Sequence, residues 1–268
     1  MPKNKIYDCI TFFDENLLTN SRFRILDKVV DYFVICESKF DHKGDKKKLN
    51  FSLHDKKFEK KIIYIIFDNL INFKNRWDIE KQQREKIFDG ILNASQDDYI
   101  MYSDSDEIPN PKILENFNLK KKFGIFFQNF YVYKLNIFNK YETPWEGTRI
   151  CKKKDLKSFF FLRKNILSKN IFKPFWKLNV EKNIETYLNG GWHFNNLYNA
   201  ELISKKLKSF PHEEYSSEKY SNPDVIQKKI NNLEDLFERN QKYEKIQIDN
   251  SFPSYILDNH EKFKDFIL

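Results

Sequence analysis

Glycine and cysteine are scarce in this sequence. Six glycines among 268 residues leave no glycine-rich phosphate loop, and neither G-x-x-x-x-G-K-[ST] nor G-x-G-x-x-G occurs. Three cysteines, Cys9, Cys36 and Cys151, are too few and too widely spaced for a zinc site or a disulfide framework. Cys9 and Cys36 lie in apolar runs, so we expect them to be buried free thiols.

Long apolar runs are also missing. No stretch approaches the roughly 18 residues that a membrane-spanning helix requires, and the first residues contain no apolar signal core. We therefore expect no transmembrane span. A cytoplasmic location, where thiols stay reduced, is the simplest expectation.

Aromatic and basic residues, by contrast, are abundant. The chain has 27 Phe and 14 Tyr, and 40% of its residues are hydrophobic, so a sizeable core can form. Its net charge of +8 favours an anionic partner: a nucleotide diphosphate, an anionic glycan, a membrane surface or nucleic acid. No RNA-recognition, helix-turn-helix or zinc-finger pattern accompanies the lysines, so nucleic acid is not expected, whereas peripheral membrane contact stays open.

Apolar runs alternate with helical spacing over the first 110 residues. Strands are expected at residues 6–13, 32–36, 61–67 and 99–102, and helices at residues 17–30 and 75–94. This order predicts an α/β fold with a parallel, Rossmann-type sheet, in which ligands bind beyond the carboxyl ends of the strands.

The second half of the chain is expected to extend this sheet and then become helical. A further strand, antiparallel or parallel, is expected at residues 123–133, a turn with an exposed Trp145 at 141–149, and helices at 197–207 and 223–239. No linker stands out. We therefore expect one domain over residues 1–268, with a nucleotide half at about 1–110 and an acceptor and helical half at about 111–268.

The stretch of residues 97–111 ends an apolar strand in three acids, Asp104, Asp106 and Glu107. If the strand stays extended, Asp104 and Asp106 point to one face. Neighbouring carboxylates repel each other, and Mg²⁺ or Mn²⁺ would neutralise them while bridging to a phosphate. An acidic turn with solvated carboxylates is the alternative.

Other polar or aromatic residues are expected near these acids. Phe12 and Glu37 also fall at the carboxyl ends of predicted strands, so we expect a site there. Further along, residues 190–194 read Gly-Gly-Trp-His-Phe. Two glycines permit a tight bend, which makes His193 a candidate metal ligand, although a structural histidine is the alternative.

Several of these motifs together resemble a known family. The matching segments are residues 6–9 with Asp14, Glu15 and Arg22; residues 30–38; Trp77 with Gln83 and Arg84; residues 103–109; Trp145 with Gly147; residues 190–194; and residues 209–214. In this order they resemble glycosyltransferase family seventeen, which includes the β-1,4-mannosyl-glycoprotein 4-β-N-acetylglucosaminyltransferases.

The resemblance implies a GT-A-like mixed sheet, a divalent metal (Mn²⁺ or Mg²⁺) and a UDP-sugar donor, UDP-GlcNAc above all. It implies transfer of the sugar, with inversion, to a hydroxyl of a glycan acceptor. Asp106 would hold the metal, Asp104 would bind the metal or the ribose, and His193 would supply a further ligand. The remaining donor contacts would come from Phe12 near the base, Glu37 and Arg84 near the nucleoside and phosphates, and Trp192 with Trp145 as a wall against the sugar.

An inverting transfer also needs a group that deprotonates the acceptor hydroxyl. The candidates are Glu107, Glu146, Glu213 and Glu214, with a preference for Glu214 because it lies beside His212 in the last matching motif. Glu107, Glu214 and His212 are thus the expected catalytic residues.

Two other functions use the same features. A metal-dependent phosphohydrolase or nuclease would use these acids, but it usually needs a second carboxylate or histidine cluster, which the sequence does not show. A basic nucleic-acid-binding protein would bind in a salt-sensitive manner and would not need a nucleotide sugar.

Overall fold

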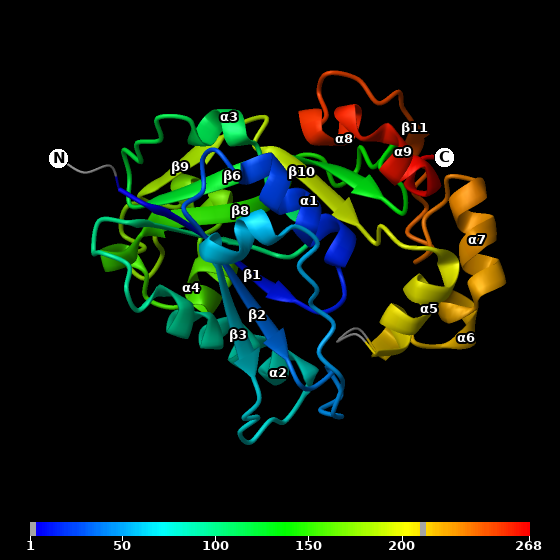
Figure 1. Ribbon diagram of the computed structural model, residues 1–268, viewed down its shortest axis with the longest axis horizontal. Coiled ribbons are helices and arrows are strands. Elements are labelled where there is room, and N and C mark those ends of the chain that lie inside the picture. Colours follow the sequence, from blue (N-terminus) through cyan, green and yellow to red (C-terminus); the bar gives the residue numbers. More distant parts are fainter. Residues whose placement is uncertain (1–3, 210–212) are drawn as a thin grey trace.

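The computed structural model describes residues 4–209 and 213–268. Four parallel strands form one side of its sheet in the order β3–β2–β1–β4, with β3 at the edge (Figure 1). Their bounds are β1 (Ile6–Phe12), β2 (Tyr32–Ser38), β3 (Ile62–Phe67) and β4 (Tyr99–Ser103). Because these strands run in one direction, their carboxyl ends meet at a single edge. The predicted Rossmann-type order is confirmed.

Strands from the rest of the chain, some antiparallel and some parallel to their neighbours, extend the same sheet. Strand β8 pairs with β4, and β6 pairs with β8, so the sheet is mixed as expected. These further strands are β5 (Glu107–Pro109), β6 (Phe123–Val132), β7 (Ile137–Phe138), β8 (Trp145–Lys152), β9 (Ile184–Tyr187), β10 (Gly191–Asn195) and β11 (Glu244–Lys245). The turn expected at residues 141–149 is confirmed for residues 141–144 only, because Trp145 begins a strand and is half-buried rather than exposed.

Alternating side chains of the parallel strands face two layers of helices. Phe33 and Ile35 pack toward one face, with α1 (Asn16–Leu26) and α3 (Pro111–Leu114). Val34 and Cys36 pack toward the other face, with residues of α2 (Arg76–Lys86), η2 (Ile87–Ile91) and α4 (Phe159–Lys164). Both faces of a parallel sheet must be covered, so its strands consist mainly of apolar residues.

Helices of the C-terminal part gather beside the sheet (Figure 1). They are α5 (Ala200–Ser209), α6 (Glu218–Ser221), α7 (Pro223–Asn231), α8 (Ser254–Asp258) and α9 (His260–Phe263). The predicted cap of α7 is confirmed, because the side chain of Asn222 accepts the Asp224 N–H at 2.9 Å. That helix is shorter than expected, since Leu233 adopts a positive φ of 59°. Within the described ranges, no helix combines the length and apolar character needed to span a bilayer.

Gly191 begins β10 with a φ of +135°, and a Cβ placed there would lie 2.1 Å from the Ile108 carbonyl oxygen. We expect Gly191→Ala to lower the free energy of unfolding by roughly 1–3 kcal/mol, because both the backbone conformation and the contact become strained. Urea unfolding measures this effect, with Thr186→Ala, an exposed position on β9, as the control. An unchanged midpoint for Gly191→Ala would show that this backbone tolerates a side chain.

Candidate active site

The acidic stretch is a turn rather than a continued strand. Strand β4 ends at Ser103, and the Glu107 N–H donates to the Asp104 carbonyl at 3.1 Å before β5 begins. The Asp104 N–H in turn donates to a carboxylate oxygen of Glu107 at 3.1 Å. Because the chain turns here, the expectation that Asp104 and Asp106 share one strand face is wrong. The two acids meet different partners.

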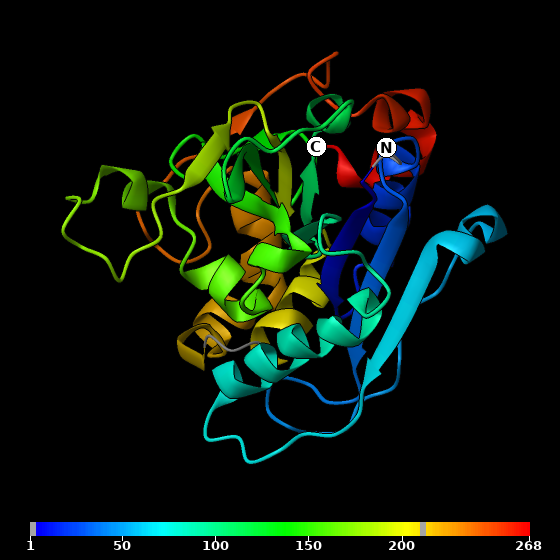
Figure 2. The same ribbon diagram turned by 90° about the vertical axis from the view of Figure 1, so that its left-hand side faces the viewer.

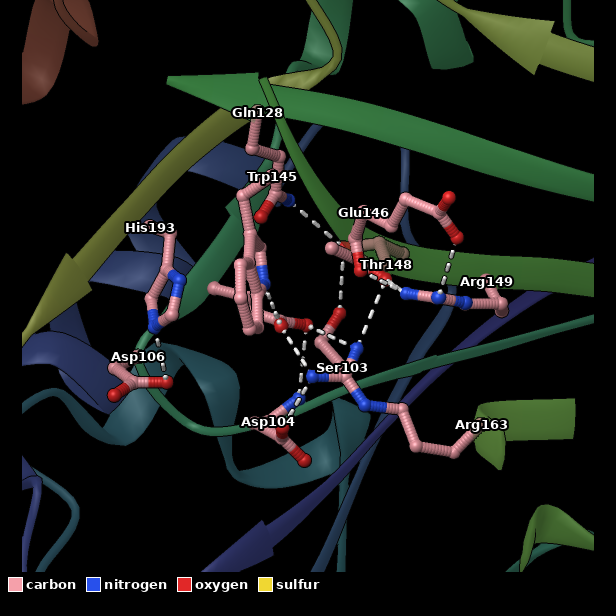
Figure 3. Close-up of polar contacts among 12 residues, drawn as sticks. Ser103, Asp104, Asp106, Gln128, Trp145, Glu146, Thr148, Arg149, Arg163 and His193 are labelled. Atoms are coloured by element: carbon pink, nitrogen blue, oxygen red, sulfur yellow. Dashed lines mark hydrogen bonds and ion pairs between the residues drawn. The ribbon is translucent and has the colours of Figure 1, made fainter. Parts of the chain in front are cut away.

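Asp104 is held by two arginines, of which Figure 3 labels Arg163. Arg163, from α4, lies 2.5 Å from Asp104 Oδ2, and Arg84, from α2, lies 3.7 Å from Oδ1. The Tyr102 hydroxyl donates to Oδ1 at 3.2 Å. Burial alone would raise the pKa of Asp104, but the charges of Arg163 and Arg84 outweigh it and hold the pKa far below its usual range. Its side chain is still 37% exposed, so Asp104 is an ionised group that a ligand can reach.

Asp106 faces His193 across the turn (Figure 3). His193 lies on β10, next to Glu107 in register, and its Nε2 is 3.4 Å from Asp106 Oδ1. The imidazole ring packs against Phe130 and Trp145, with ring centroids 4.3 and 5.0 Å away. Burial opposes ionisation of Asp106, but the charge and hydrogen bond of His193 lower its pKa overall. The structure thus brings together two predicted ligands, Asp106 and His193, that lie far apart in the sequence.

Glu107 is a structural acid in this arrangement. Its side chain is fully buried, and one carboxylate oxygen accepts the Trp145 indole N–H at 2.7 Å. Arg163 donates to both oxygens, at 2.6 and 3.2 Å. Every oxygen of Glu107 is therefore engaged away from solvent, which does not fit a base that must reach an acceptor.

Trp192 lies on the opposite face of β10 from His193. Successive side chains of a strand alternate, so the two residues cannot point into the same site. The Trp192 ring is buried among Phe252, Ile256 and neighbouring apolar side chains, and its N–H donates to the Ser251 carbonyl at 2.9 Å. The predicted sugar wall is therefore not formed by Trp192, whereas half-buried Trp145 does border His193.

Phe12 and Glu37 lie at the expected edge of the sheet, but their side chains point inward. Phe12 is buried and packs edge-on against Phe51 at 5.5 Å. The Glu37 carboxylate is buried too and binds Lys47, Tyr64 and two backbone N–H groups of the following loop. Direct contact of either side chain with a nucleoside does not fit these positions, because both support the loop that follows β2.

Arg84 is buried as well, and its guanidinium faces Asp104 rather than solvent. Its Nε donates to the Tyr102 hydroxyl at 2.8 Å, and its guanidinium also pairs with Glu80. The neighbouring Gln83 donates to the carbonyls of Phe12 and Cys36, and so joins α2 to the ends of β1 and β2.

The candidate bases are spread widely. Glu146 is tied to Ser168 and Arg149, whereas Glu214 is exposed, beyond α5. His212 lies outside the described residues, and Glu213 is described only as the start of the short helix η5 (Glu213–Tyr215). Of Glu107, Glu146 and Glu214, the three candidates whose side-chain burial the structure describes, Glu214 is the most exposed.

Three contributors to this site carried no recognisable motif. One is Arg163, which lies in a basic and aromatic segment without regular spacing. The others are Lys205 and Lys206 of α5. The charge of Lys206 lowers the pKa of Asp106, although burial and His193 have larger effects on it. The charge of Lys205 lowers the pKa of Asp14, where burial and Glu15 have larger effects in the opposite direction. Burial, followed by the charges of Glu15, Asp14 and Asp106, raises the pKa of Tyr198, just before α5. No local signal marks such residues, because folding alone brings α5 to the acidic turn.

Comparison with known families identifies the chain. The model of glycosyltransferase family 17 matches residues 1–148, more than half of the sequence. The chain belongs to glycosyltransferase family 17. The matched region contains Asp104, Asp106 and Trp145, whereas His193 lies beyond it. A search of curated proteins finds no match.

Solved structures show distant similarity. Glucosyl-3-phosphoglycerate synthase from Mycobacterium tuberculosis, solved with Mn²⁺, UDP and glucosyl-3-phosphoglycerate, is 11% identical with a TM-score of 0.38 and covers 77% of this chain and 76% of its own. A glycosyltransferase involved in glycosylation of the major capsid of PBCV-1 is 10% identical (TM-score 0.32; 68% and 81% covered). HddC from Yersinia pseudotuberculosis is 10% identical (TM-score 0.37; 73% and 92% covered). At such low similarity, no ligand or activity is transferred from them to this family 17 member.

A divalent metal, which the family implies, fits the donor atoms at the acidic turn. Asp106 offers a carboxylate oxygen and His193 an imidazole nitrogen, and both are ligands of such ions. In residues 4–209 and 213–268, no three His, Cys, Asp or Glu side chains are grouped to hold a metal by themselves. Magnesium commonly takes only one or two carboxylates and completes its shell with substrate phosphates and water. The site is thus suited to an ion whose remaining coordination positions are filled by the oxygens of a diphosphate.

A separate cavity of about 620 Å³ lies between the end of β3 and α2 in this transferase. Its walls include Phe67, Asn69, Lys74, Lys81 and Gln82. Neither Asp104 nor Asp106 lines it. The acidic turn therefore lies outside this cavity.

Proposed function

We propose that this family 17 glycosyltransferase moves GlcNAc from UDP-GlcNAc to a hydroxyl of a glycan acceptor, with inversion at the anomeric carbon. One observation carries the proposal: Asp106 and His193 face each other beside ionised Asp104, at the carboxyl ends of parallel strands. Such an edge is where open α/β sheets bind their ligands.

Each residue of the site has a distinct proposed role. Asp106 and His193 would hold Mn²⁺ or Mg²⁺, and a bound ion would supply positive charge that neutralises the departing diphosphate. Arg163 and Arg84 keep Asp104 ionised, so that it can bind the ribose or the ion. Lys206, whose charge acts on Asp106, is positioned to attract the phosphates.

The acceptor side of the reaction needs a surface on which the sugar can pack and a base that takes the hydroxyl proton. Trp145 presents a half-buried ring next to His193, and aromatic faces suit the apolar faces of sugars. The acceptor oxygen attacks the anomeric carbon as the bond to the diphosphate breaks, and Glu214 takes the hydroxyl proton. UDP leaves with the electrons of the broken bond.

Thermal unfolding in the presence of nucleotides tests the proposal. We expect UDP-GlcNAc with Mn²⁺ to raise Tm by on the order of 5 °C at saturating concentration, because ligands that bind only the folded state stabilise it. UDP-GlcNAc without metal, Mn²⁺ alone and ADP-glucose with Mn²⁺ are the controls. Equal stabilisation by all nucleotides, or by DNA, would contradict the assignment. Hydrolysis of the diphosphate to UMP and GlcNAc 1-phosphate, without sugar transfer, would instead indicate a phosphohydrolase.

A further inference from the structure

A loop between η4 (Ser168–Phe172) and β9 exposes an unusual amount of apolar surface. We call residues 172–182 the aromatic loop. Its large apolar side chains are almost fully open to solvent: Phe172 is 85% exposed, Phe175 82%, Trp176 67% and Leu178 90%. Figure 2 shows this loop projecting from the body, with no other element over it. Contiguous exposure of this kind marks an interaction surface.

Lysines alternate with these apolar residues. Lys169, Lys173 and Lys177 are each separated by three uncharged residues, most of them apolar, and Glu181 is the single acid between Lys169 and Lys182. In the part of the chain that the structure describes, none of the three has a carboxylate partner among the ion pairs. Their positive charge is therefore available to an external anion.

Internal hydrogen bonds hold the loop in shape. The Lys182 ammonium donates to the carbonyls of Pro174 and Phe175, at 2.6 and 3.1 Å. The Lys177 N–H donates to the Pro174 carbonyl at 3.1 Å, and the rings of Phe175 and Trp176 pack edge-on at 5.1 Å. These contacts tie the backbone to itself and leave the aromatic side chains facing outward. The exposed rings thus form a defined tip.

We propose that the aromatic loop docks the protein on a bilayer that contains anionic lipids. Phe, Trp and Leu side chains enter the boundary between headgroups and acyl chains, and lysines extend their ammonium groups back to the phosphates. Trp is enriched at this depth because its ring is amphipathic. The shape favours lipid over a protein partner, since a protruding tip inserts into a fluid layer without a matching groove. The charge favours it too, because each lysine near an anionic surface strengthens attachment.

The position of the aromatic loop gives docking a consequence for the site. The loop joins α4, which carries Arg163, to β9, and β10 with His193 follows. Attachment would hold the acidic turn near the lipid surface. If the proposed function holds, acceptors embedded in that surface would be favoured.

Vesicle binding tests this inference without any donor or acceptor. The full chain is sedimented with vesicles of phosphatidylcholine, with or without phosphatidylglycerol. We expect binding to the anionic vesicles, and roughly tenfold or greater loss of affinity in Phe175→Ser/Trp176→Ser and in Lys173→Glu/Lys177→Glu. Leu92→Ser is the matched control, since Leu92 is 72% exposed but lies far from the loop in sequence, after η2. It should bind as the unchanged protein does.

A spectroscopic readout accompanies sedimentation. Insertion should shift tryptophan emission to shorter wavelength, and Trp176→Phe should remove most of that shift while retaining binding. All substituted side chains are exposed, so an unchanged Tm verifies folding. Equal vesicle binding by the loop variants and the control, or no binding to anionic vesicles, would overturn the proposal. A loop-dependent dimer measured by light scattering would overturn it as well, in favour of a second copy as the occupant.

Discussion

Asp106→Asn should lower kcat/KM for the nucleotide sugar by roughly 100- to 1000-fold, because a neutral amide binds a divalent cation and its diphosphate poorly. The side chain makes its one close contact among the described residues with His193, and its backbone carbonyl still accepts the Phe194 N–H at 2.8 Å. We therefore expect little change in Tm. The measurement is metal-dependent release of UDP, with and without acceptor.

Asp97→Asn is the matched control for this substitution. Asp97 lies just before β4, is exposed, and pairs only with surface lysines Lys152 and Lys154. Its loss should leave turnover unchanged. Full metal-dependent turnover in Asp106→Asn would mean that the ion, if one is used, is held elsewhere.

Arg163→Met should lower the free energy of unfolding by about 3–5 kcal/mol, because it leaves the carboxylates of Asp104 and Glu107 without their shared cation. Glu107 is fully buried and cannot regain water without disrupting β5 and β8. Equilibrium unfolding in urea measures the loss. Lys164→Met, at the exposed next position of α4, should change stability by no more than about 0.5 kcal/mol.

The pH dependence of this loss has a definite sign. In the unchanged protein, the low pKa of Asp104 contributes stability that is present above its unfolded value of about 3.9 and is lost as pH falls. Without Arg163, burial would instead favour the protonated acid. The difference between the two proteins should therefore shrink as pH is lowered from neutrality toward the ordinary aspartate range.

A second substitution separates charge imbalance from lost packing. Adding Glu107→Gln to Arg163→Met removes one of the two stranded charges, so the double variant should be more stable than the sum of the single effects predicts. Purely additive losses would show that Arg163 acts through packing, and that the carboxylates are neutralised in another way.

The two aspartates of the acidic turn differ in what balances their charge. Asp104 is balanced by protein cations, whereas the neighbour of Asp106 is a histidine that can also act as a ligand. This difference favours Asp106 over Asp104 as the principal metal ligand. Asp104 remains suited to a ribose hydroxyl or to a second bond to the ion.

Much of the parallel sheet could be predicted from the sequence. Uninterrupted apolar runs such as residues 32–36 favour burial on both faces of a sheet, and the helical spacing between such runs indicates parallel crossovers. The Asn222 cap and the bend at residues 190–191 could also be predicted, because each depends on local sequence: the cap on one side chain, and the bend on a glycine. The family's motifs identified the acids and His193 as one group.

Side-chain direction and distant partners were decided only by tertiary structure. Whether residues 103–107 continue a strand or turn depends on pairing with β10, so alternation placed Asp104 and Asp106 wrongly. Trp192 and His193 are adjacent in sequence yet lie on opposite faces of β10. Trp192 packs into an apolar cluster with Phe252, whereas His193 packs against Phe130. Arg163 meets Asp104 across 59 residues, a contact that arises from helix packing on a sheet rather than from any local pattern. Residue identity thus determined which groups were available, and the fold determined which of them meet.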